Sequence, residues 1–226
     1  MSHTVAGLWR IEEDEAFFLE RLNLYENERV RLSGIKHPQK RLEWLSSRLC
    51  LKQLLQISYR VESLNQQNGK PYLSDNSHHI SYSHSRKYSA VIASDRRDVA
   101  IDIETLDRRR NLETRFLFMN PYELAYFDDH NRDEHIFFLI WSAKETLFKI
   151  IGKRGISLRQ HIALNLDQLS LVRNGILSGT VLDGEERQSF QVHYELLPEY
   201  ILTYAQEQVV QPQLQPDYWY DFGEGE

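Results

Sequence analysis

The sequence is poor in cysteine, in long apolar runs and in excess positive charge. Cys50 is the single cysteine among 226 residues, which excludes an internal disulfide and a thiolate metal cluster. No apolar run approaches the length of a membrane-spanning helix, and residues 1–10 lack the apolar stretch of a signal peptide. The 27 Lys and Arg residues are outnumbered by 33 Asp and Glu, and the net charge of −6 disfavours nonspecific binding to nucleic acid. We therefore expect a cytoplasmic protein that binds neither membranes nor nucleic acid.

The composition and the apolar patterns are typical of a folded protein that contains helices and strands. Hydrophobic residues make up 41% of the chain and charged residues 27%, which is too apolar for intrinsic disorder. Apolar residues at helical spacing predict helices within residues 12–25, after Pro38 and around residues 139–151. Runs rich in β-branched and aromatic residues predict strands at residues 80–83, 88–93 and 99–104.

The two halves of the chain share a spacing pattern. Trp44 lies eight residues before Lys52, and Trp141 lies eight residues before Lys149, each pair inside a predicted helix. Four residues of the later strand pairs recur at one constant offset, so that Ile80, Tyr82, Tyr88 and Ala93 correspond to Val192, Tyr194, Tyr200 and Ala205. The pattern favours two similar α/β units in tandem. Helix-then-hairpin segments are common enough to produce it by chance, so the pattern alone leaves both explanations open.

Two carboxylates lie two residues apart on one predicted strand. Asp102 and Glu104 project from the same face, because side chains alternate along a strand. Glu145 and Lys149 are four residues apart and share a face of the predicted helix. If strand and helix meet, three carboxylates would need a cation, and oxygen-only ligation selects Mg²⁺. The alternatives are a solvated strand face and a surface ion pair worth about 0.3–0.5 kcal/mol.

Two further segments carry charge or possible chemistry. Residues 29–41 are basic, contain no acidic residue and could hold a phosphate or an acidic partner, although such a run is usually a solvated face. Residues 81–85 place a histidine between serines. This segment does not indicate a hydrolase. A serine and a histidine that are neighbours in the chain cannot serve together as nucleophile and base, and no Gly-x-Ser-x-Gly elbow surrounds them.

Four segments, taken in order, form a specific set. They are Gly69-Lys70-Pro71, Ser81-Tyr82-Ser83-His84-Ser85, Ala100-Ile101-Asp102-Ile103-Glu104 and Trp141-Ser142-Ala143-Lys144-Glu145-Thr146-Leu147-Phe148-Lys149. This set resembles the 4′-phosphopantetheinyl transferases of the larger, two-lobed, surfactin-synthetase-activating type. The resemblance implies an α+β fold of two similar α/β lobes in pseudo-twofold tandem. We expect an N-terminal lobe at residues 1–104, a C-terminal lobe at residues 105–210 and an acidic, aromatic tail at residues 211–226.

The resemblance also implies an activity. The phosphopantetheine arm of coenzyme A would be transferred to a serine of an apo acyl or peptidyl carrier protein, with release of adenosine 3′,5′-bisphosphate. In that family Asp102, Glu104 and Glu145 would be Mg²⁺ ligands, and Lys149 would stabilise or protonate the leaving phosphate. Either Glu123 or Glu145 would be the base for the serine, and the resemblance does not choose between them.

Contacts with the coenzyme and the carrier follow from the same resemblance. Lys70, Ser83 and His84 are expected at the phosphates and the adenosine end of coenzyme A. Lys36 and Arg41 match the basic positions that hold its 3′-phosphate. An acidic carrier could dock on one of four arginines, which could equally be a solvated cluster: Arg108, Arg109, Arg110 and Arg115.

Two other functions remain open from the residues alone. A Mg²⁺-dependent nuclease generally places its second acid and its lysine as Glu-x-Lys on a strand, whereas Glu145 and Lys149 have helical spacing. A non-catalytic module could use the basic residues 29–41 to hold an acidic protein. A chain with two lobes would supply both sides of the interface between them without a second copy, so we expect a monomer.

Overall fold

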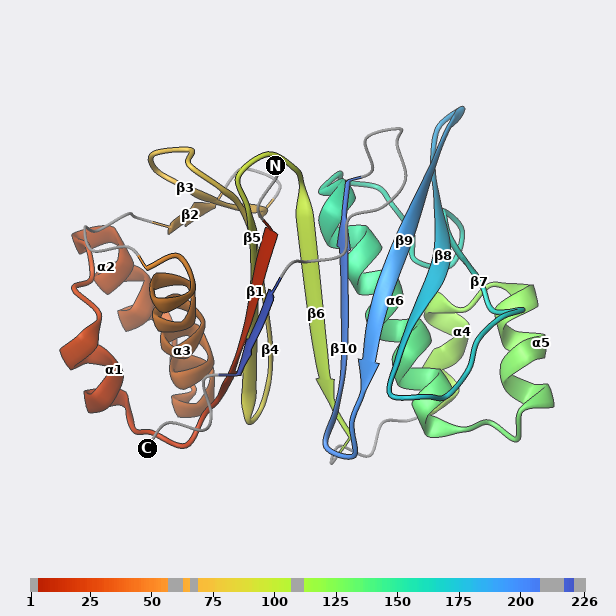
Figure 1. The fold of residues 1–226 in the computed structure, drawn as a ribbon, viewed down its shortest axis with the longest axis horizontal. Coiled ribbons are helices and arrows are strands. Elements are labelled where there is room, and N and C mark those ends of the chain that lie inside the picture. The colour runs from red at the N-terminus through yellow and green to blue at the C-terminus, as the bar shows by residue number, and fades with distance from the viewer. Residues whose placement is uncertain (1–3, 57–62, 66–68, 107–111, 208–217, 222–226) are drawn as a thin grey trace. The chain divides into compact units, whose positions relative to one another are not determined.

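The computed structural model describes residues 4–56, 63–65, 69–106, 112–207 and 218–221. The chain divides into two units, Met1–Asp98 with Gln213–Glu226 and Val99–Pro212. Each unit contains one sheet and its own helices, so the α+β class expected from the sequence is confirmed (Figure 1). Within the described part of the chain, no helix is long and apolar enough to cross a membrane.

The first unit is built on a six-stranded sheet in the order β11-β1-β5-β4-β3-β2. Strand β11, at the edge, runs parallel to β1, and the other pairs are antiparallel. Figure 1 shows the three helices of this unit on one face of the sheet. The elements, in chain order, are β1 (Thr4–Arg10), α1 (Glu15–Arg21), α2 (Glu26–Gly34), α3 (Pro38–Leu54), β2 (Ser63–Asn65), β3 (Pro71–Leu73), β4 (His79–Ser85), β5 (Tyr88–Ser94) and β11 (Tyr218–Asp221).

Local sequence explains where these helices begin and end. The predicted helix at residues 12–25 is shorter than expected, because Leu22 is extended and a second helix, α2, starts at Glu26. Asp14 caps α1 by accepting from the backbone of Phe17. Helix α3 starts at Pro38, where the missing N–H of proline costs no hydrogen bond. Its apolar side, including Leu45 and Leu49, packs into the core of the first unit.

The second unit is built on a five-stranded antiparallel sheet in the order β6-β10-β9-β8-β7. Its longest helix, α6, is capped by Asp133 and is followed directly by Gly152, whose φ of 59° suits a residue without a side chain. The elements, in chain order, are β6 (Val99–Thr105), η1 (Leu112–Thr114), α4 (Arg115–Phe118), α5 (Pro121–Asp129), α6 (Glu134–Ile151), β7 (Ile162–Asn165), β8 (Asn174–Asp183), β9 (Glu186–Leu196) and β10 (Tyr200–Gln206).

The two units repeat one order of elements. Each starts with a strand and continues through helices into four strands, and β1-β5-β4-β3-β2 has the same connectivity as β6-β10-β9-β8-β7. The first unit has β11 as an additional edge strand. The repeated residues of the sequence pattern lie on β4 and β5 in the first unit and on β9 and β10 in the second. The common plan supports the tandem explanation over chance.

The boundary between the units differs from the expected one. We expected residues 99–104 in the N-terminal lobe, but β6 pairs with β10 from Val99 opposite Gln206 to Thr105 opposite Tyr200. The division therefore falls after Asp98. The expected tail is also partly structured, because residues 218–221 form β11, while its other residues lie outside the described ranges.

Candidate active site

Strand β6 and helix α6 meet through direct polar contacts. Lys149 Nζ donates to Asp102 Oδ1 at 2.7 Å and to the carbonyl of Ile101 at 3.0 Å. Trp141 Nε1 donates to Glu104 Oε1 at 2.7 Å. Asp102 and Glu104 therefore both face the helix, which follows from the alternation of side chains along β6.

Hydroxyl groups hold Asp102 from its other side. Ser142 Oγ donates to Asp102 Oδ2 at 2.8 Å. The hydroxyls of Ser142 and Thr146 lie 2.9 and 2.7 Å from Thr203 Oγ1 on β10. Burying a carboxylate costs free energy unless hydrogen bonds and an opposite charge compensate. Asp102 is only 6% exposed, so it depends on Ser142 and Lys149 for both kinds of compensation.

We call Asp102, Glu104, Trp141, Ser142 and Lys149 the β6–α6 cluster. Glu145 lies on α6 between Ser142 and Lys149 and is partly exposed. Within the described ranges, no three side chains of His, Cys, Asp or Glu are close enough together to hold a metal ion, so the three expected ligands do not form one cluster. Asp102 and Glu104 nevertheless fit Mg²⁺ by donor chemistry, because this ion takes oxygen ligands and often binds one or two carboxylates with waters and substrate phosphates.

Glu123, one of the two expected bases, is closed off from solvent. Its side chain is 0% exposed and pairs with the equally buried Lys144 at 2.6 Å. It also accepts from the backbone N–H groups of Asn120 and Leu164. Burial raises the pKa of Glu123 despite the neighbouring ammonium group. In this structure Glu123 ties α5, α6 and β7 together.

Arg41, expected at the 3′-phosphate, uses most of its donors within the first unit. Its guanidinium makes a two-pronged pair with Glu15 and donates to the carbonyls of Leu32 and Ile35. It therefore holds α1, the end of α2 and α3 together. Lys36 lies exposed on the link between α2 and α3, and it has no polar partner among the described residues.

The other expected coenzyme residues lie near opposite ends of β4. Lys70 Nζ pairs with Asp98 at 2.6 Å, and the same carboxylate contacts His79, the first residue of β4. His84 lies near the end of that strand and contacts Glu43 on α3. Five residues of strand separate His79 from His84, or roughly 17 Å. Ser83 is buried and projects from the opposite face of β4 to His84.

The expected carrier-docking arginines fall into two groups. Arg108, Arg109 and Arg110 lie outside the described residues. Arg115 is not available for docking, because its side chain is 6% exposed, pairs with Glu113 and donates to the carbonyl of Leu112.

Several contact residues were not identified from the sequence. Glu43 follows Lys40 by three residues on α3, and this helical spacing could have indicated their ion pair. Its contact with His84 depends on how α3 packs on β4. The roles of Ser142 and Thr203 depend on the pairing of β6 with β10, which the spacing of residues does not reveal.

Carboxylates that can hold a metal ion and a nearby cation are groups that phosphoryl transfer uses. The model of the 4′-phosphopantetheinyl transferase superfamily matches residues 98–205, which extend from β6 into β10 and include the whole β6–α6 cluster. The chain thus carries a domain of this superfamily, and membership implies phosphopantetheine transfer to carrier proteins. No curated protein matches the chain.

Proposed function

We propose that the chain transfers 4′-phosphopantetheine from coenzyme A to a serine of an apo acyl or peptidyl carrier protein. Adenosine 3′,5′-bisphosphate is the second product. The observation that carries this proposal is the β6–α6 cluster, because its two buried carboxylates and its lysine lie within the segment that matches the superfamily. Carboxylates and a cation at one place are what transfer from a pyrophosphate to an alcohol requires.

The reaction exchanges one phosphorus–oxygen bond for another. The serine Oγ forms a bond to the β-phosphorus of coenzyme A, the bond from that phosphorus to the bridging oxygen breaks, and the serine proton passes to a base. Asp102 and Glu104 are the proposed Mg²⁺ ligands, because the described structure does not gather Glu145 into one cluster with them. When bound, Mg²⁺ would neutralise charge on the pyrophosphate. Lys149 is the proposed cation at the leaving phosphate.

Of the two candidate bases we propose Glu145. Glu123 is fully buried in its pair with Lys144, whereas Glu145 is partly exposed one residue further along α6. A base must come within hydrogen-bond reach of the proton that it accepts. Glu123 is then a structural residue of the same unit.

Coenzyme contacts are proposed for the first unit. Lys36 and Lys70 supply cations, and His84 supplies a partly exposed ring nitrogen. Arg41 is not proposed as a phosphate ligand, because its guanidinium already pairs with Glu15. We propose that Arg41 fixes the chain segment that carries Lys36.

The test is to incubate the protein with coenzyme A, Mg²⁺ and a panel of apo carriers, and to measure the intact mass of each carrier. At least one acyl or peptidyl carrier should gain one phosphopantetheine, and its Ser→Ala variant should gain none. Plasmid DNA and RNA are incubated in parallel. Nucleic-acid cleavage without any carrier modification would favour the nuclease alternative, and carrier binding without a mass gain would favour the binding module.

A further inference from the structure

A buried carboxylate on α3 holds a lysine and a histidine side chain. Glu43 has a side chain that is only 2% exposed, although it lies near the start of the helix. Its Oε2 accepts from Lys40 Nζ at 2.6 Å and lies 3.0 Å from His84 Nδ1 on β4. Three titratable groups of the first unit therefore meet at one oxygen atom.

The burial of Glu43 needs an explanation other than stability. Burial alone raises the pKa of this carboxyl, but the hydrogen bonds from His84 and Lys40 bring the pKa below its ordinary value. The carboxylate is therefore charged at neutral pH. A buried ion pair is weak evidence for a stabilising role, because desolvation offsets most of the attraction. Its geometry, by contrast, fixes the direction of the groups that it binds.

The contact determines which nitrogen of His84 is available. A carboxylate accepts hydrogen bonds, so Nδ1 must carry the proton that it shares with Glu43. His84 has no other polar partner among the described residues, and its side chain is 40% exposed. Nε2 is thus the open end of the ring. A carboxylate on one ring nitrogen fixes the tautomer and orients the other nitrogen.

We propose that Glu43 is a positioning residue, which holds His84 through Nδ1 so that Nε2 can contact a phosphate of coenzyme A. The inference rests on the proposed function, because the ligand is the coenzyme of that reaction. A hydrogen bond between Nε2 and an anionic phosphate oxygen would be charge-assisted. Glu43 itself touches neither the coenzyme nor the carrier serine.

The first experiment measures coenzyme A binding to the full chain by isothermal titration calorimetry. Glu43→Gln keeps the size of the side chain and removes its charge. We expect the dissociation constant to rise about tenfold, the size of one lost charge-assisted hydrogen bond. In transfer assays the KM for coenzyme A should rise to a similar extent, while kcat at saturating coenzyme and the KM for the carrier stay within about twofold.

A double-mutant cycle separates positioning from a general structural role. If Glu43 acts through His84, the change Glu43→Gln should weaken binding in the wild-type background and have no further effect in His84→Ala. Equal, additive losses in both backgrounds would overturn the proposal. So would wild-type affinity in Glu43→Gln.

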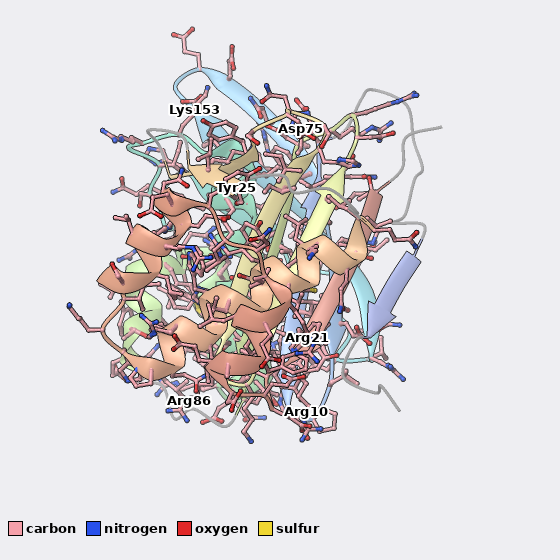
Figure 2. The ribbon with its side chains drawn as sticks, turned by 90° about the vertical axis from the view of Figure 1, so that its left-hand side faces the viewer. Arg10, Arg21, Tyr25, Asp75, Arg86 and Lys153 are labelled. Carbon is pink, nitrogen blue, oxygen red and sulfur yellow. The ribbon has the colours of Figure 1, made fainter. Side chains whose placement is uncertain are left out.

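The matched control is Asp75→Asn, which changes the net charge by the same amount within the first unit. Asp75 lies on the turn before β4 and accepts from the backbone of Ser77. Figure 2 shows Asp75 at one end of this unit and Arg86, two residues beyond His84, at the other. Asp75→Asn should bind coenzyme A like the wild type.

A measurement on the wild-type protein covers the case in which Glu43→Gln fails to fold. Nitrogen-15 NMR of the histidine side chains, assigned with His84→Ala, should show a proton on His84 Nδ1 at neutral pH. A ring protonated only at Nε2 would contradict the proposal. If the wild-type protein does not bind coenzyme A at all, the proposed function fails instead, so the two failures are distinguishable.

Discussion

The first strand of each unit occupies the same place in its sheet but carries different chemistry. Strand β1 pairs with β5, and β6 pairs with β10, in equivalent registers: Arg10 lies opposite Tyr88, and Thr105 lies opposite Tyr200. Counting from these pairs relates each residue of β1 to one residue of β6. The two strands differ most at the two positions that carry carboxylates in β6.

Gly7 and Trp9 of β1 correspond to Asp102 and Glu104 of β6. Trp9 is 4% exposed and belongs to the apolar core of the first unit. Glu104 is 8% exposed and instead accepts a hydrogen bond from Trp141. One backbone plan thus accommodates an apolar residue in the first unit and a buried carboxylate in the second.

The residues that surround these positions differ in the same way. Apolar residues of the first unit correspond to hydroxyl residues of the second: Leu45, Leu49 and Val91 correspond to Ser142, Thr146 and Thr203. An apolar layer is therefore sufficient for the fold. Burying polar groups there costs free energy unless they are paired, so their presence in the second unit is better explained by function than by stability.

The largest expected effect is on stability, at the buried pair of the second unit. Lys144→Met leaves Glu123 without its ion-pair partner and should lower the free energy of unfolding by about 3–5 kcal/mol. Ser47 occupies the corresponding position of α3, and Ser47→Ala should cost about 1 kcal/mol. Urea denaturation measures both. Equal losses in the two variants would mean that this pair is no more important than a single buried hydroxyl on a helix.

Next in size is the loss of the lysine beside Asp102. Lys149→Met removes the proposed cation at the leaving phosphate and should lower kcat about 100-fold. The control is Lys52→Met on α3, because Lys52 is exposed at the corresponding position and, within the described part of the chain, its side chain donates only to the carbonyl of Arg21. That variant should retain wild-type transfer. A similar loss in both variants would remove the functional distinction between the two helices.

A smaller effect is expected at the paired tryptophans. Trp141→Phe removes the hydrogen bond to Glu104 and should lower kcat/KM about fivefold, the equivalent of about 1 kcal/mol. Trp44 has a buried indole N–H with no hydrogen-bond partner among the residues that the structure describes. Trp44→Phe should leave kcat/KM unchanged. The comparison is wrong if Trp44→Phe impairs transfer more than Trp141→Phe.

The smallest effect concerns pH. His193 on β9 stacks on Tyr204 of β10, and burial lowers its pKa below the ordinary value near 6.5. The folded state then binds fewer protons than the unfolded state, so stability should fall as pH drops below about 6.5, by less than about 1 kcal/mol. His193→Gln should flatten the stability between pH 5.5 and 6.5. An unchanged slope would assign that pH dependence to other groups.

The sequence predicted the parts of the fold that depend on short patterns. The helix after Pro38, the strands that became β4, β5 and β6, and the helix around Trp141 all form within a few residues of their predicted positions. The break between α1 and α2 was missed, because Leu22 fits the apolar pattern while its backbone is extended. Strand pairing was out of reach, so β6 was given to the wrong unit.

The candidate site was predictable in its residue types but not in its contacts. Alternation along a strand placed Asp102 and Glu104 on one face, and that face meets α6. The burial of a side chain could not be predicted from the sequence. Glu123 and Arg115 are buried, whereas Glu145 is partly exposed. Arg41 and His84 showed the same limit, because their acidic partners come from distant positions.

The most direct test of the account is the intact mass of one apo carrier after incubation with coenzyme A, Mg²⁺ and either the wild-type protein or Asp102→Asn. Asparagine keeps the hydrogen bond from Ser142 and removes the charge that pairs with Lys149. We expect the wild type to convert the carrier fully and the variant to be at least about 100-fold slower, with its circular dichroism unchanged. Transfer by Asp102→Asn at the wild-type rate would contradict the account.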